Sequence, residues 1–196
     1  MTIDFPDKFV ELFKKDLSLS DEEYSLFISF FHKEFVGKKQ HYLRAGEVNK
    51  WKAYVTKGCS RNYIVDETGK EKTLFFCFED WWLGDIESFL TGKPCKQYVQ
   101  AIEDMELLCI TKTDFYALGE RIPKLLAWFN TKIQKTHFAT MHRLVEAKSA
   151  QPEEQYLSLL EKQPDIYQRI PLQYIASYMN IEPQSLSRLR KRLMQK

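Results

Sequence analysis

The residues best suited to chemistry lie near the carboxyl end of the chain, on one face of a segment expected to be helical. Pro183 is typical of a first helical turn, and a stripe of leucines follows it at helical spacing, at Leu186, Leu189 and Leu193. The opposite face carries amide, hydroxyl and cationic side chains, which can donate hydrogen bonds to the bases or phosphates of a nucleic acid. These side chains are Gln184, Ser185, Ser187, Arg188, Lys191 and Arg192.

A second short helix is expected directly before this one, joined to it by a tight turn. Ile175 and Met179 would face inward there, and the small side chain of Ala176 allows the next helix to approach closely. Asn180 falls at the turn, where asparagine tolerates a left-handed backbone. The pattern is typical of a helix-turn-helix. The alternative is a two-helix hairpin whose basic face is simply solvated.

The positive charge of the chain is concentrated in the same region. The 196 residues include 29 Lys and Arg and 27 Asp and Glu, which gives a net charge of +2. Residues 183–196 carry five basic side chains and no acidic one. A total this close to neutral does not indicate a nucleic-acid-binding protein by itself, but the local positive field favours one.

Short β-rich runs between residues 40 and 111 predict an antiparallel barrel or jelly roll. Glycines such as Gly58 and Gly84 mark the breaks between runs, where glycine adopts a positive φ without strain. The turn Glu67–Lys70, which contains Gly69, predicts a β-hairpin between two of the runs. The runs are Trp51–Thr56, Ser60–Asp66, Lys72–Phe78, Gln97–Ile102 and Glu106–Thr111.

Helical patterns flank the β-rich region on both sides. Residues 1–36 are expected to be helical, with Ser20 as an N-cap and Glu23 completing a capping box. After residue 115, apolar residues spaced by 4, 3 and 4 predict a long helix. The seam suits either packing on the chain's own barrel or contact with a second copy of the chain. Its members are Ile122, Leu126, Phe129 and Ile133, with Leu144 further along.

The order of these elements resembles the Crp/Fnr family of bacterial transcription regulators over nearly the full chain. The resemblance rests on Leu43–Glu47, Asp66–Glu71 and Gly84–Ile86 in the β-rich region, and on Ile175-Ala176 and Ser185–Arg188 near the carboxyl end. It implies an α+β fold: an N-terminal antiparallel β jelly roll of the cyclic-nucleotide-binding type with flanking helices, a long dimerisation helix, and a C-terminal helix-turn-helix domain. We expect the sensor domain at 1–148, with its dimer helix at about 122–148, and the DNA-binding domain at 149–196.

The resemblance also implies roles for single residues in DNA recognition. The family's recognition helix often carries an acidic residue followed by Ser-Arg, and the matching residues here are Gln184, Ser187 and Arg188. Arg188 would read guanine through O6 and N7, whereas Gln184 suits adenine at least as well as cytosine. Gln173 is expected to contact a phosphate, and the helix from Ile122 to Leu144 is expected to form a dimer coiled coil.

An effector pocket is implied as well. Family members that bind cyclic AMP use a Gly-Glu turn for the ribose and an Arg-Ser pair for the cyclic phosphate. The matching segments here are Gly84–Ile86 and Cys95-Lys96, and neither a thiol nor the point charge of a lysine replaces the planar fork of arginine. The expected small-molecule effector is therefore not cyclic AMP, and no cofactor is assigned. The pocket residues implied are Gly84, Asp85, Ile86, Cys95, Lys96 and Thr140.

Other classes of function find no support in the sequence. The four cysteines form no CxxC pair and the four histidines have no metal-site spacing, so no metal is expected. No catalytic triad or phosphate loop is present, so the protein is not expected to be an enzyme. Apolar runs are too short for a membrane span, and no secretion signal is recognisable.

We therefore expect a cytoplasmic, homodimeric, sequence-specific DNA-binding transcription regulator. Its partners would be double-stranded DNA, a second copy of the chain and RNA polymerase, without a membrane. The alternative is a ligand-binding or protein-interaction module whose helix-turn-helix no longer reads DNA.

Overall fold

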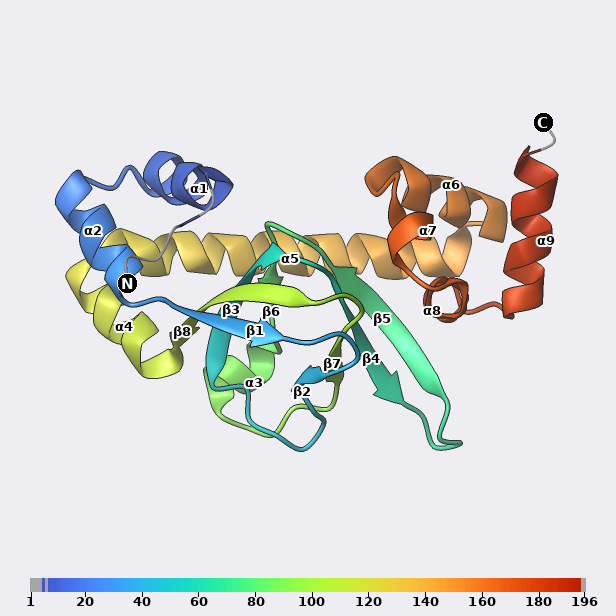
Figure 1. Cartoon of the computed structure of the whole chain (residues 1–196), viewed down its shortest axis with the longest axis horizontal. Coiled ribbons are helices and arrows are strands. Elements are labelled where there is room, and N and C mark those ends of the chain that lie inside the picture. The colour runs from blue at the N-terminus through green and yellow to red at the C-terminus, as the bar shows by residue number, and fades with distance from the viewer. Residues whose placement is uncertain (1–4, 6, 195–196) are drawn as a thin grey trace.

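Two four-stranded antiparallel sheets form the middle of the molecule in the computed structural model, which describes residue 5 and residues 7–194 (Figure 1). The first sheet has the strand order β1-β8-β3-β6 and the second has the order β2-β7-β4-β5. Neighbouring strands that are distant in sequence are typical of a jelly roll. The strands are β1 His32–Val36, β2 His41–Leu43, β3 Trp51–Lys57, β4 Ser60–Val65, β5 Glu71–Cys77, β6 Trp82–Leu83, β7 Tyr98–Ala101 and β8 Met105–Thr111.

Apolar side chains from both sheets fill the space between them. Ala53 and Val55 of β3 are completely buried there, as alternation along a strand with one core-facing side requires. The β4–β5 hairpin turns at Asp66, whose Oδ1 accepts hydrogen bonds from the backbone N–H of Thr68 at 3.0 Å and of Lys70 at 2.9 Å. The predicted hairpin and the antiparallel, jelly-roll-like arrangement are both confirmed.

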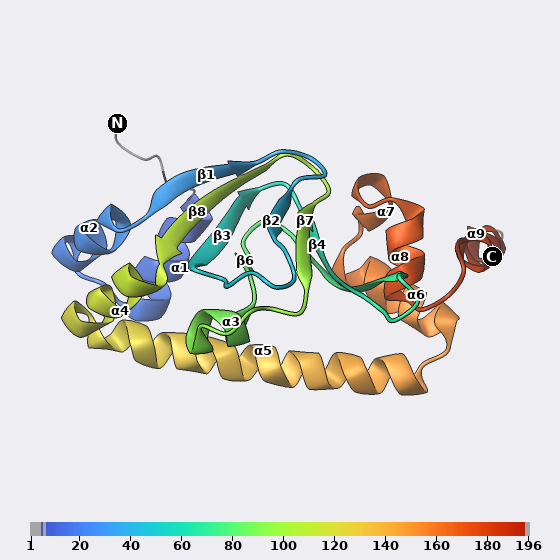
Figure 2. The same cartoon turned by 90° about the horizontal axis from the view of Figure 1, so that it is seen from below.

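Helices cover the outer face of the first sheet. They are α1 (Asp7–Leu17), α2 (Asp21–Ser29), α4 (Lys112–Arg121) and the first half of α5 (Pro123–Ser149), which lie at one end of the molecule (Figure 2). The contact is largely aromatic: the ring centres of Phe9 and Tyr54 are 4.9 Å apart, and those of Phe13 and Phe27 are 4.4 Å apart. These rings are buried, so they anchor the helices to the sheet.

The N-terminal segment contains one strand that the local sequence pattern did not predict. The capping box is confirmed, because Ser20 Oγ accepts from Glu23 N at 3.1 Å and Glu23 Oε2 accepts from Ser20 N at 2.8 Å. However, β1 (His32–Val36) lies within the residues predicted to be helical. It pairs in register with β8 over five residues, and this tertiary pairing overrides the local preference.

The long helix α5 packs on its own chain with its first half and exposes its second half. Ile122, which caps the end of α4, and Phe129 are only 1% and 7% exposed, in the core shared with α1, α4 and the first sheet. The predicted dimer contact needs a correction here, because these two side chains are already used inside one chain. Leu126 and Ile133 are partly buried against the same core, whereas Leu144 is 49% exposed.

The amine of Lys52 in β3 lies between the first sheet and the helices that cover it. Its Nζ lies 5.7 Å from the ring centre of Trp82 and 5.5 Å from that of Phe129. Burial lowers the pKa of Lys52 from its ordinary value of 10.5 to about 8. The unfolded chain therefore holds this proton more tightly than the native state does. Burying the charged amine lowers the free energy of unfolding, and this loss has its full size below pH 8.

We expect Lys52→Met to raise the free energy of unfolding by about 1–2 kcal/mol at pH 7. The gain should shrink between pH 8 and pH 10.5, because the wild-type native state sheds its buried charge across that range and becomes more stable. Urea unfolding at pH 7 and pH 10 measures both effects. Lys57→Met is the control, since Lys57 is exposed at the end of the same strand. A gain of equal size at both pH values would contradict this account.

Four helices follow α5 and pack around a separate apolar cluster. They are α6 (Pro152–Lys162), α7 (Ile166–Arg169), α8 (Leu172–Tyr178) and α9 (Pro183–Met194), and they lie at the far end of α5 (Figure 1). Ile166, Ile175 and Leu186 are completely buried in this cluster. The cluster also contains Phe76 of β5 and Phe78 directly after β5, so the C-terminal helices pack against the barrel.

Candidate functional site

Helix α9 presents the polar and cationic face that the sequence predicted. Gln184, Arg188 and Lys191 are exposed on it, while Leu186 and Leu189 are buried on the opposite side. The helix stands at the extreme end of the molecule, beyond the barrel and the other C-terminal helices (Figures 1 and 2). Of the other predicted contacts, Ser185 and Ser187 are half-buried, and Arg192 and Gln173 are exposed.

The turn before α9 holds this face in place. Asn180 adopts a φ of 53°, so the left-handed backbone predicted for it is confirmed. The N–H of Ile181 donates to the carbonyl oxygen of Ala176 at 3.0 Å, and Ala176 itself is completely buried. A larger side chain at Ala176 would push the two helices apart, since the interior is already closely packed.

The cations of α9 differ in how available they are. Arg188 makes one weak internal contact, from Nη2 to Ser185 Oγ at 3.3 Å. Arg192 Nη2 instead donates to Glu153 Oε2 of α6 at 2.7 Å, which ties the far end of α9 to its own chain. Arg190 lies with its Cζ 4.4 Å from the ring centre of Tyr167 and is therefore a packing residue. Arg188 and Lys191 are the cations best placed for an external ligand.

The predicted effector residues gather in part around the short helix α3 (Ile86–Thr91). Gly84 takes a φ of 120°, and Asp85 follows it as the N-cap of α3. Asp85 Oδ1 accepts from Ser88 N at 2.8 Å, and its Oδ2 accepts from Gln97 Nε2 at 2.9 Å. Both carboxylate oxygens are therefore engaged by the chain itself. Ile86 is partly buried and packs against the helical core next to this turn.

The remaining effector residues do not form a phosphate site. Cys95 is buried, and its Sγ lies 3.1 Å from the carbonyl oxygen of Arg44. Lys96 is exposed. Thr140 is exposed on α5, and its hydroxyl donates to the carbonyl oxygen of Thr136 at 2.8 Å. Burial raises the pKa of the Cys95 thiol, so the neutral form is favoured there.

Sequence reasoning missed two further features of the barrel and its surroundings. The first is a pair of polar side chains inside the barrel: Ser60 and Asn62 of β4 are completely buried, and neither finds a hydrogen-bond partner among the described residues. Asn62 lies opposite Val99, a residue of the barrel core. Alternation along β4 could have indicated that two polar residues face inward, but only once the inward face was known.

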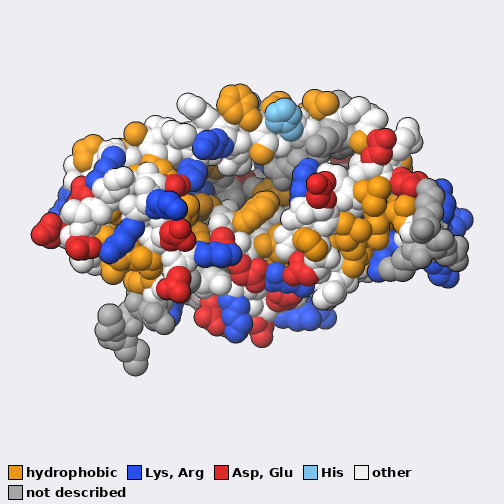
Figure 3. Space-filling model, turned by 90° about the horizontal axis from the view of Figure 1, so that it is seen from above, with side chains coloured by type: hydrophobic (Ala, Val, Ile, Leu, Met, Phe, Trp, Pro, Cys, Tyr) orange, Lys and Arg blue, Asp and Glu red, His pale blue; other side chains and the backbone are white. Residues whose placement is uncertain are grey.

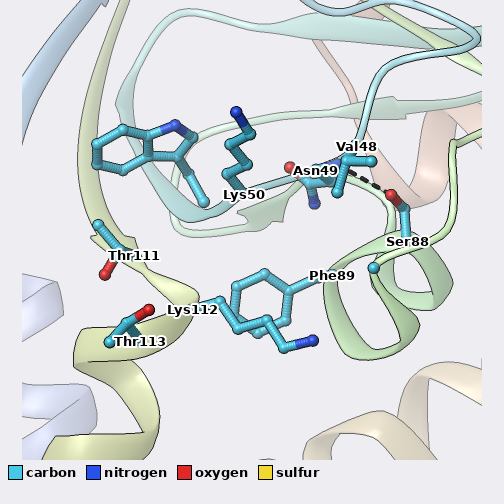
Figure 4. A pocket seen from close by; sticks show the side chains of 10 residues that line it. Val48, Asn49, Lys50, Ser88, Phe89, Thr111, Lys112 and Thr113 are labelled. Atoms are coloured by element: carbon cyan, nitrogen blue, oxygen red, sulfur yellow. Dashed lines mark hydrogen bonds between the residues drawn. The ribbon is translucent and has the colours of Figure 1, made fainter.

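The second feature is a cavity of about 330 Å³ outside the barrel, between the start of β3, α3 and the start of α4 (Figure 4). Trp51 and Phe89 form its apolar walls, and Lys50 and Lys112 stand at its edge. Its wall is connected to the predicted effector turn, because Asn49 N donates to Ser88 Oγ at 2.9 Å and Asn49 Nδ2 donates to the carbonyl oxygen of Asp85 at 3.0 Å. Segments far apart in sequence line this cavity, so no local motif could have predicted it.

The described residues contain no cluster of side chains suited to hold a metal ion. Within the same residues, no helix combines the length and apolar character that crossing a membrane requires.

Comparisons with known proteins agree with this architecture. Residues 33–121 match the family model of the cyclic nucleotide-binding domain. No curated protein matches the chain by sequence. Among solved structures, the chain is similar to the c-di-GMP responsive global regulator CLP of Xanthomonas campestris, with 14% identity, coverage of 90% of this chain and 92% of that chain, and a TM-score of 0.71.

Two further structures cover most of the chain. The catabolite activator protein of Thermus thermophilus shares 22% identity over 94% of this chain and 86% of that chain, with a TM-score of 0.58. FixK2 from Bradyrhizobium japonicum shares 12% identity over 84% of this chain and 85% of that chain, with a TM-score of 0.69. Identities this low show a shared fold. Residues 33–121 therefore resemble a cyclic nucleotide-binding domain, and the chain shares its overall fold with these three regulators.

Proposed function

We propose that this protein is a sequence-specific DNA-binding transcription regulator in which α8 and α9 form a helix-turn-helix. The observation that carries the proposal is the amphipathic character of α9, whose leucines are buried while Gln184, Arg188 and Lys191 remain exposed at the end of the molecule. Side chains near the start of such a helix reach base edges in a major groove, and later ones meet phosphates. Gln173 at the start of α8 is exposed, as a phosphate contact requires.

The proposed assembly is a homodimer joined through the second half of α5. Phe138, Met141 and Val145 follow an i, i+3, i+7 spacing and are 61%, 43% and 63% exposed, and Leu144 beside them is 49% exposed. No other element lies on the outer side of α5 in Figure 2, and hydrophobic side chains stand along the upper edge of the surface in Figure 3. A second copy of the same helix would cover this stripe, which lies on the side of α5 opposite to its packed residues.

In this proposal the barrel is the sensor and its effector is not cyclic AMP. Both oxygens of Asp85 are already held by Ser88 and Gln97, and Cys95 is buried with its sulfur near a carbonyl oxygen. Neither residue offers the positive charge that a cyclic phosphate needs. A regulator of this kind would act in the cytoplasm with RNA polymerase and carry out no catalysis.

Selection of bound duplexes from a random pool by the purified full-length chain tests the proposed function. We expect enrichment of a two-fold symmetric sequence with half-site centres about one helical turn apart, roughly 34 Å. Binding of that duplex should exceed binding of a scrambled duplex by about a thousandfold or more at physiological salt. Recovery of no sequence preference would contradict the proposal and favour an interaction module that does not read DNA.

A further inference from the structure

Arg169 of α7 joins the C-terminal helices to the barrel by a four-point contact. Its Nη1 and Nη2 donate to the two carboxylate oxygens of Glu79 at 2.9 and 2.7 Å. Its Nε and Nη2 donate to the two oxygens of Glu103 at 3.1 and 2.7 Å. The side chain of Arg169 is only 19% exposed, and those of Glu79 and Glu103 are 35% and 32% exposed. Two planar, bidentate pairs of this kind fix direction as well as distance.

The acceptors of this contact are themselves fixed in the barrel. Glu79 Oε1 also accepts from the backbone N–H of Gly58 at 2.9 Å. Glu103 follows Ile102, whose N–H donates to the carbonyl oxygen of Cys59 at 2.9 Å. The Cζ of Arg169 also lies 5.4 Å from the ring centre of Phe78. The guanidinium is therefore held between parts of the barrel that cannot follow it if the C-terminal helices turn.

Helix α8 adds a second contact at the edge of the second sheet. Ser177 Oγ accepts from the backbone N–H of Thr73 at 3.0 Å and donates to the carbonyl oxygen of Glu71 at 3.1 Å. Arg61 of β4 is 3% exposed, and its Cζ lies 3.8 Å from the ring centre of Tyr174. These contacts leave α9 untouched, so docking orients the helix without covering its polar face.

We propose that Arg169 is a positioning residue for DNA recognition: by locking α6–α9 onto the barrel, it fixes the direction of α9 relative to α5 and so the separation of the two α9 helices in a dimer. The inference rests on the function proposed above. The link between α5, which ends at Ser149, and α6, which begins at Pro152, is only two residues long. Without the lock, α6–α9 can rotate about that link.

Cys59 is a built-in reporter of the lock. It is completely buried in the apolar cluster that also contains Ile166, Ile170 and Ile175 of the C-terminal helices. Burial raises the pKa of the Cys59 thiol. The nearby Glu103 carboxylate raises this pKa further, and the Arg169 guanidinium lowers it. The other cysteines belong to the barrel core instead, and they are Cys77, Cys95 and Cys109. Release of α6–α9 should therefore expose Cys59 alone.

The test measures alkylation of each cysteine by N-ethylmaleimide in native full-length protein, with mass spectrometric identification of the site. We expect Arg169→Gln to raise the rate at Cys59 by about tenfold or more, because the substitution leaves two half-buried carboxylates without their cationic partner. The rates at the barrel cysteines should stay unchanged, which shows that the barrel remains folded. Arg121→Gln is the matched control, since Arg121 is exposed on α4. Arg169→Lys should restore protection only in part, because lysine has no planar fork.

The second readout is spacing preference on DNA. Using the selected symmetric duplex and a version with about five base pairs inserted between half-sites, half a helical turn, wild type should strongly prefer the first. Arg169→Gln should reduce that preference about tenfold, and Glu79→Gln with Glu103→Gln should add little to it, because the three residues act as one unit.

The outcomes separate the lock from the proposed function. Cys59 alkylation in Arg169→Gln at the wild-type rate overturns the lock. Faster alkylation with an unchanged spacing preference overturns the positioning role. If wild type binds no duplex at any spacing, the proposed function fails, and the Cys59 rates alone decide for or against the lock.

Discussion

The double substitution Phe138→Asp and Val145→Asp is expected to turn the protein into a monomer and to lower its affinity for a symmetric duplex by more than about a hundredfold. Both side chains are more than 60% exposed on the outer side of α5, where a second copy would bury them. Losing two buried apolar side chains removes about 3–5 kcal/mol, and burying two unpaired carboxylates would add to the loss. Fold stability should change little, because neither side chain contributes to the core of one chain.

Sedimentation equilibrium gives the dimer dissociation constant, and fluorescence anisotropy gives the affinity for DNA. The matched control is Thr136→Asp, which adds a carboxylate to an exposed position on the opposite side of the same helix. The control should stay dimeric at protein concentrations where the double variant is monomeric. A double variant that keeps the wild-type mass in solution would show that the copies join elsewhere.

Substitution of Arg188 by alanine is expected to weaken binding to the selected duplex by about 1–3 kcal/mol and to relax the base preference at one position of each half-site. Arg188 is exposed in the first half of α9, and its one internal hydrogen bond, to Ser185 at 3.3 Å, is weak. A guanidinium that donates twice to guanine O6 and N7 loses both bonds at once when it is truncated.

Lys191→Ala is the matched comparison on the same face. We expect it to weaken binding to all duplexes by a similar factor and to reduce the slope of affinity against salt by about one phosphate contact. Arg192→Ala should do less, because Arg192 is already paired with Glu153 at 2.7 Å. Anisotropy titrations over a range of salt and with single-base variants of the half-site separate these effects. An Arg188→Ala variant that loses affinity equally for every sequence would place Arg188 on a phosphate.

Local signals predicted the elements whose cause is local. The capping box at Ser20, the hairpin at Asp66 and the left-handed Asn180 each depend on residues within a few positions, and the structure confirms all three. The amphipathic pattern of α9 belongs to the same class, because a buried stripe and an exposed face follow from the helical period alone.

Elements that depend on distant partners could not be predicted in this way. Strand β1 exists because it pairs with β8, some seventy residues away, although its own residues do not specify a strand. The first half of α5 carries a seam that suits either a partner chain or its own barrel, and the structure assigns Ile122 and Phe129 to the barrel. For the same reason, the sequence does not single out Phe138 and Val145, since only the structure shows which side of α5 is left uncovered.

Two groups near the effector turn illustrate a different limit. The resemblance implied that Asp85 and Cys95 line a pocket. In the structure, however, the Asp85 carboxylate accepts hydrogen bonds from Ser88 and Gln97. Whether a polar side chain is free or already satisfied depends on its three-dimensional neighbours. Asn62 is the opposite case, because it is buried without a hydrogen-bond partner among the described residues.

The contact of Ser177 with β5 has a consequence for how the chain can be divided. β5 is the outermost strand of its sheet, and α8 occupies the backbone groups of Thr73 and Glu71 at its open side. A fragment that stops near residue 148 would leave these groups, and the apolar Phe76 and Phe78, facing water. Such an edge is a template for intermolecular strand addition and aggregation. The helices that are proposed to read DNA therefore also keep the barrel soluble.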